Sequence, residues 1–146
     1  MSSVRDFRVL GANLVDLDQA ALDRLTDAEV LIESGRPAAA ISMGLYCIEI
    51  ALKARICRNL DLIQLPRPFE IHDLGGLLVL TGLSHRMKTA ADRIQYNWLG
   101  LTDMAVKIND LRYSPDANWS IQEAQDLLEQ LRNPVDGVLQ WLSTQH

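Results

Sequence analysis

The stretch that most constrains this chain is the segment from Ala38 to Leu52, in which Glu49 is the only charged residue. Its apolar residues leave no polar face when they are placed on a helix, and the helical pattern extends over about 37–58. A helix without a polar face must be buried among other helices. Since the apolar segment is too short to span a bilayer, it predicts the central helix of a helical bundle and no association with a membrane.

Further helical segments flank this central helix. Apolar residues repeat at three- and four-residue spacing over 14–33, which predicts an amphipathic helix there, and a shorter helix is expected over about 72–81. Residues 59–71 contain two prolines and are expected to form a loop. Apolar stripes continue through 85–111, and whether this region forms one bent helix or two stays open.

The C-terminal third begins with a turn and ends with a helix. The segment from Arg112 to Asp116 contains Ser114-Pro115 and is expected to be a turn. Ser120 has Glu123 three residues on, which is the spacing of a capping box at a helix start. The apolar stripe of this last helix is interrupted at Asn133-Pro134, so we expect a kink or a restart there.

These elements predict the fold class. No segment alternates apolar and polar residues long enough to be a strand, and hydrophobic residues (48%) and charged residues (23%) have the balance of a globular chain. We expect an all-α bundle of five or six helices, mostly antiparallel, that forms a single domain over 1–146. Trp98 and Trp141 fall on or beside apolar stripes, so we expect them in the core or a subunit interface rather than on a stacking surface.

The charge distribution limits the class of ligand. The formal net charge is −5, which argues against tight binding of nucleic acid regardless of sequence. Residues 53–112 nevertheless carry nine basic and six acidic side chains. This middle region is therefore the part of the chain in which a polyanion would be tolerated, unless its charges only solvate helix surfaces.

Cysteines and histidines show no pattern of a metal site. Cys47 and Cys57 lie about 15 Å apart along one predicted helix, beyond disulfide reach, so we expect two reduced cysteines. The three histidines form no HxxxH or HExxH pair, and neither cysteine belongs to a CxxC motif. We expect no metal and no cofactor. The N-terminus has no apolar signal core, and a cytoplasmic location is expected.

The candidate site is a polar cleft. Glu49 and Lys53 are four residues apart on the predicted central helix, in the favourable order for an ion pair. One interpretation is a salt bridge at the edge of the bundle, without further function. The other is a ligand-binding cleft in which Glu49 and Lys53 meet His72, Arg112 and Tyr113, which follow loops or begin helices where the end of a bundle can converge.

The order and spacing of these residues resemble the HEPN (higher eukaryotes and prokaryotes nucleotide-binding) superfamily over about residues 20–142. The residues that carry the resemblance are Ala38-Ala39, Tyr46, Glu49, Ala51, Leu52, Lys53, Ala54, His72-Asp73-Leu74, Leu77-Leu78, Trp98-Leu99, Arg112-Tyr113 and Trp141-Leu142. The resemblance implies a bundle of four or five helices that pairs into homodimers. It also implies a role in prokaryotic toxin–antitoxin, defence or RNA-processing systems, often beside a small nucleotidyltransferase.

Catalytic members of this superfamily are metal-independent RNases with an Arg-x4–6-His motif, usually with a polar residue after the arginine. Only Arg67 and His72 have this spacing here, and Pro68 follows the arginine in a predicted loop. With this departure from the motif, the resemblance implies a non-catalytic binding or regulatory module, with nucleotide or RNA as the ligand class and a nucleotidyltransferase as the partner. The alternatives are an RNase that uses Arg67 and His72, and a helical structural subunit without a ligand.

Overall fold

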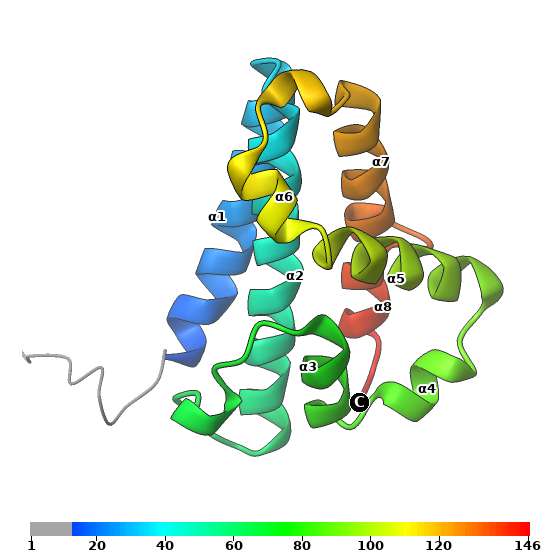
Figure 1. The fold of residues 1–146 in the computed structure, drawn as a ribbon. Coiled ribbons are helices and arrows are strands. Elements are labelled where there is room, and N and C mark those ends of the chain that lie inside the picture. The colour runs from blue at the N-terminus through cyan, green and yellow to red at the C-terminus, as the bar shows by residue number, and fades with distance from the viewer. Residues whose placement is uncertain (1–12) are drawn as a thin grey trace, which may run out of the picture.

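A computed structural model describes residues 13–146 and contains eight α-helices (Figure 1). Within these residues the only β pairing is a single bridge between Asn13 and Gln64, so the expectation of an all-α fold is confirmed. None of the described helices is long and apolar enough to cross a membrane. The α-helices are α1 (Leu14–Glu33), α2 (Pro37–Asn59), α3 (Leu74–Leu80), α4 (Ser84–Lys88), α5 (Asp92–Ala105), α6 (Ile108–Tyr113), α7 (Ile121–Arg132) and α8 (Val138–Ser143), with 3₁₀ turns at Arg67–Phe69 and Asp116–Asn118.

Helix α2 is the central element, as its sequence predicts. Its side chains at Ile41, Ile48, Leu52 and Ile56 are completely buried, and α1, α3, α6 and α7 all contact it. It begins with Pro37 at a position where the missing N–H costs nothing. Because apolar side chains surround the α2 axis, neighbouring helices cover it from several sides (Figure 1).

The direction of the helices differs in one respect from the expected antiparallel bundle. Helices α1 and α2 are antiparallel, but α7 and α8 run in the same direction as α2 (Figure 1). Gly44 faces Leu127 of α7, and Arg55 further along α2 donates to the carbonyl oxygen of Leu142 at 3.3 Å. A Cβ at Gly44 would lie 3.0 Å from Leu127 Cδ2, so a larger residue would require the Leu127 side chain to shift, and glycine allows the close approach without it. The parallel pairing requires the long connection that contains α3 to α6.

The region 85–111 contains three helices rather than one or two. Helix α4 ends at Lys88, and Ala91 adopts an extended conformation (φ −54°, ψ 145°) immediately before α5. A second break at Val106 and Lys107 separates α5 from α6. The prediction of a turn at Arg112 was wrong, because Arg112 and Tyr113 form the last turn of α6. The helix ends at Ser114, which is extended because Pro115 follows it.

The predicted helix ends are largely confirmed by their caps. Ser120 and Glu123 form both hydrogen bonds of a capping box, each at 3.0 Å. Helix α7 ends at Arg132. The side-chain oxygen of Asn133 then accepts hydrogen bonds from the backbone N–H groups of Val135 and Asp136, which follow Pro134. The third helix begins two residues later than expected, because the Asp73 side chain accepts from Gly76 N–H at 2.8 Å and caps it.

Asp116, the first residue of the 3₁₀ turn that follows α6, contacts the start of α2. Arg36 precedes α2 but its side chain does not cap the helix. Instead the Asp116 carboxylate accepts from the Ala38 N–H at 3.1 Å and from the Arg36 guanidinium at 2.6 Å. Hydrogen bonding to Arg36 is the main reason that the pKa of Asp116 lies below its usual value. This contact holds the chain that follows α6 against the first turn of α2.

Candidate functional site

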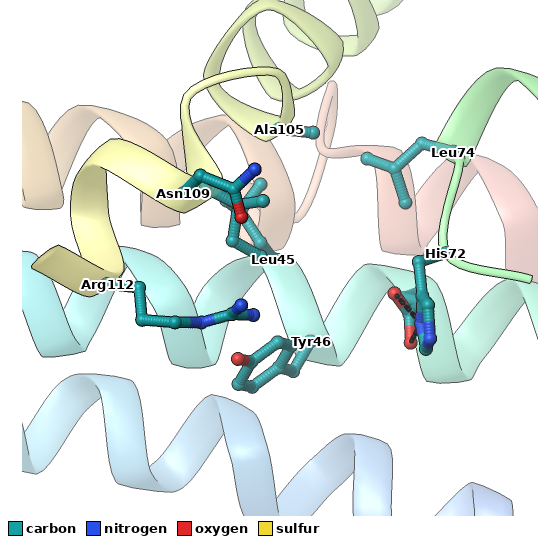
Figure 2. Close-up of a pocket in the computed structure, with 9 residues that line it drawn as sticks. Leu45, Tyr46, His72, Leu74, Ala105, Asn109 and Arg112 are labelled. Atoms are coloured by element: carbon teal, nitrogen blue, oxygen red, sulfur yellow. Dashed lines mark hydrogen bonds and ion pairs between the residues drawn. The ribbon is translucent and has the colours of Figure 1, made fainter.

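A cleft of about 410 Å³ lies between α2 and α6, at the segment that leads into α3 (Figure 2). Its lining comes from the middle of α2, the segment that leads into α3 together with the first residue of α3, the last residue of α5 and one face of α6. The lining combines four polar side chains and one aromatic ring with an apolar floor. The lining residues are Leu45, Tyr46, Glu49, His72, Leu74, Ala105, Ile108, Asn109 and Arg112.

Helical spacing places these side chains on facing surfaces. Tyr46 and Glu49 are three residues apart on α2, and Asn109 and Arg112 are three residues apart on α6, so each pair shares one face of its helix. Figure 2 shows Arg112 and His72 on either side of Tyr46 in this view. The cleft therefore has one cationic group at one end, a ring in the middle and a carboxylate with an imidazole at the other end.

The carboxylate end is held by a buried ion pair. Lys53 Nζ lies 3.2 Å from Glu49 Oε2, and the side chains of Lys53 and Glu49 are only 9% and 14% exposed. His72 Nδ1 lies 3.2 Å from Glu49 Oε1, while the His72 side chain is 84% exposed. Lys53 thus fixes the carboxylate from beneath. His72 contacts it from the solvent side.

The cationic end is formed by Arg112. Hydrogen bonding with Tyr113, and then with Tyr46, raises the pKa of Arg112 above its usual value, and the guanidinium of an arginine is charged at neutral pH in any case. A guanidinium has five N–H donors, which suits it to bind the oxygens of a phosphate or carboxylate. Asn109 is exposed beside it and offers an amide donor and acceptor.

The structure brings together three of the five predicted site residues. Glu49, His72 and Arg112 line the cleft. Lys53 lies behind Glu49 and does not line it, so it acts on the cleft only through the carboxylate. Tyr113 is 80% exposed outside the lining but reaches Arg112. The two interpretations of Glu49 and Lys53 therefore coexist, since one oxygen of the carboxylate binds Lys53 while the group also faces the cleft.

Sequence reasoning did not select Tyr46 or Asn109 as site residues. Both could have been found from helical spacing, because each stands three residues before a residue that was selected, Glu49 or Arg112. For Asn109 the helical spacing did not apply as long as Arg112 was expected to belong to a turn. The apolar floor from Leu45, Leu74 and Ile108 resembles ordinary core sequence and carries no signal of its own.

Arg67 and His72 do not meet as a motif on one helix. Arg67 is exposed in the 3₁₀ turn Arg67–Phe69, and His72 lies in the non-helical segment before α3, paired with Glu49. Only His72 lines the cleft. The described part of the chain also contains no group of three His, Cys, Asp or Glu side chains that is arranged to hold a metal ion.

The remaining candidates lie in the core. Trp98 and Trp141 are 8% and 7% exposed and belong to the main hydrophobic cluster, which confirms their assignment to the core. Cys47 and Cys57 are both free and buried, and burial raises the pKa of the Cys47 thiol to about 12. A thiol with so high a pKa is not nucleophilic at neutral pH.

Comparison with known proteins identifies the family. The sequence model of the HEPN domain matches residues 15–141, nearly the whole chain. The chain therefore belongs to the HEPN domain family. No curated protein matches it significantly, and no solved structure does so either.

Proposed function

We propose that this HEPN domain is a non-catalytic binding module whose ligand site is the cleft between α2 and α6. The observation that carries the proposal is the convergence of Arg112, Tyr46 and Glu49 on one cleft of about 410 Å³. This volume is in the range of small-ligand sites, which are mostly apolar with a few converging polar groups. The apolar floor and the four polar side chains of the cleft fit that description.

The ligand chemistry that fits best is a nucleotide, either free or at an end of RNA. Arg112 would bind the phosphate, because a guanidinium donates to two phosphate oxygens at once. The ring of Tyr46 offers a surface on which a base can stack, and such stacking is tolerant of base identity. Glu49 and Asn109 supply an acceptor and an amide for the polar edge of the base.

Two features support binding over RNA cleavage. Arg67, the arginine with motif spacing, is exposed on a 3₁₀ turn and does not line the cleft that contains His72. His72 Nδ1 instead lies 3.2 Å from the Glu49 carboxylate, and the arginine that shares the cleft with it, Arg112, comes from α6 and not from the Arg-x4–6-His spacing of the family's RNase motif. An RNase that uses Arg67 and His72 is the competing function.

Calorimetric titration with adenosine monophosphate tests the proposed site. We expect saturable binding, and Arg112→Gln should weaken it by about tenfold or more, because a charge-assisted hydrogen bond to phosphate is lost. The matched control is Arg93→Gln, an exposed arginine on α5 that stacks on Tyr96 outside the cleft. Equal affinity in all three proteins, or no binding to the wild type, would rule out the assigned phosphate site.

We also propose that the module is a homodimer. The support is that members of the family commonly form dimers, together with the exposed apolar side chains of Val15 and Val30 on α1, which are 74% and 54% exposed. A symmetric interface is the commonest form of self-association. Light scattering at micromolar concentration should give about twice the 16.4 kDa mass of one chain. A clean species of monomer mass would remove the dimer from the proposal.

The partner class that we propose is a small nucleotidyltransferase in a prokaryotic toxin–antitoxin or defence system. The support is family membership alone, since many HEPN domains act beside such an enzyme. A nucleotide-binding module is chemically consistent with a partner that handles nucleotides. The genes adjacent to this one provide the test, and a neighbourhood without a nucleotidyltransferase or other toxin component would count against it.

A further inference from the structure

A second groove, separate from the cleft at α6, lies between α1, α2 and α8. Its volume is about 630 Å³. Its floor is the α2 stripe that contains Cys47 and Ala51, and small side chains there leave room above the helix. The apolar walls come from both neighbouring helices, with Ala21 and Leu22 on α1 and Leu139 and Leu142 on α8.

One end of this groove is strongly basic. Arg55 and Arg58 continue the same α2 stripe by one and two further turns, and both line the groove. Arg86 of α4 is close enough that it lowers the pKa of Arg55, after desolvation and Arg58. Among the described residues, Asp18 is the only acidic side chain in the lining, and it is paired with Arg58. No acidic side chain of the groove is therefore left to pair with Arg55.

Arg55 is held in place but has donors to spare. Its Nε donates to Asn59 Oδ1 at 3.0 Å, and one terminal nitrogen donates to the carbonyl oxygen of Leu142 at 3.3 Å. These contacts use two of the five N–H donors of the guanidinium. A fixed guanidinium at the end of an apolar groove is positioned to bind an anion whose remainder is apolar.

We propose that this groove binds a single-chain amphiphilic anion of the fatty-acid type, with its carboxylate at Arg55 and its chain over Ala51 and between Leu22 and Leu139. Charge complementarity selects the carboxylate, because the groove has excess positive charge at one end only. The apolar walls select the alkyl chain. The volume selects a small molecule, since it lies in the range of small-ligand sites. This site is independent of the proposed nucleotide cleft.

The test is calorimetric titration of the full chain with decanoate, 1-decanol and acetate, with circular dichroism to show that the fold is retained. Decanoate carries both the chain and the anion, whereas each of the other two carries one. We expect one decanoate per chain, bound at least about tenfold more tightly than either 1-decanol or acetate. Decanoate binding no tighter than that of 1-decanol would overturn the proposal.

Two variants locate the binding. Arg55→Gln should weaken decanoate by about tenfold while leaving 1-decanol unchanged, because it removes only the charged contact. Ala51→Leu should weaken both decanoate and 1-decanol, because it fills the floor of the groove. Arg93→Gln on α5 removes the same charge elsewhere and should have no effect. Decanoate affinity that is the same in Arg55→Gln and Arg93→Gln would show that the ligand does not bind at this groove.

Discussion

Replacing Ile48 by aspartate is expected to unfold the protein. The Ile48 side chain is completely buried on α2, the helix that contacts α1, α3, α6 and α7. An unpaired carboxylate at this position costs several kcal/mol, or the carboxyl group remains protonated and still lacks hydrogen-bond partners. Since the free energy of unfolding of a domain is only about 5–15 kcal/mol, this single change removes much or all of it. Circular dichroism should show loss of the helical signal.

Ile63→Asp is the matched control. Ile63 is the same residue type but is 78% exposed in the connection after α2, so its replacement should leave the helical signal and the melting temperature nearly unchanged. A soluble, fully helical Ile48→Asp variant that melts like the control would contradict the central position of α2.

Replacing Glu49 by leucine is expected to destabilise the fold by about 2–4 kcal/mol, because it leaves the ammonium group of Lys53 buried without its partner. The Lys53 side chain is only 9% exposed, and Glu49 at 3.2 Å is its ion-pair partner among the described residues. Urea unfolding at neutral pH measures the loss as a lower midpoint at unchanged slope.

The double variant Glu49→Leu, Lys53→Met separates loss of a partner from loss of packing. Removing both charges should recover most of the stability, since replacing a buried pair by apolar side chains is often neutral or favourable. If the double variant is as unstable as Glu49→Leu alone, the ion pair is not the reason that Glu49 matters for stability. If Glu49→Leu unfolds at the wild-type midpoint, Lys53 is not buried as described.

The central helix could be predicted because its evidence is local. The absence of a polar face between Ala38 and Leu52 already requires burial, whatever surrounds the helix. The capping box at Ser120 is equally local, since it depends only on Glu123 three residues on. Features of this kind follow from neighbouring residues on one element and need no knowledge of the tertiary structure.

The three-helix division of 85–111 depends on contacts between distant residues. Asn97 of α5 is 5% exposed and donates from its amide to the carbonyl oxygen of Asp136, 39 residues away, at 2.9 Å. At the break before α5 there is also a local contact, in which the Gln95 side chain donates to the Ala90 carbonyl oxygen at 2.7 Å. Apolar spacing predicts the stripes but cannot show where a helix stops and turns to meet such partners.

The parallel direction of α7 relative to α2 also could not be predicted from the residues of either helix alone. Leu127 approaches Gly44 in this pairing, and a glycine within a helix indicates close packing but does not identify the partner. For the same reason, the cleft could not be predicted from neighbouring residues in the sequence. Glu49 and Arg112 were selected for their chemistry, but their convergence with Tyr46 depends on how α6 lies across α2.

The measurement that most directly separates a binding module from an RNase is incubation of purified protein with mixed RNA substrates in EDTA, with His72→Ala as the control. We expect no cleavage, because Arg67 is exposed on a 3₁₀ turn that begins Arg67-Pro68 and does not line the cleft with His72. RNA cleavage that tracks with the protein and vanishes in His72→Ala would contradict the proposed function and establish the competing RNase.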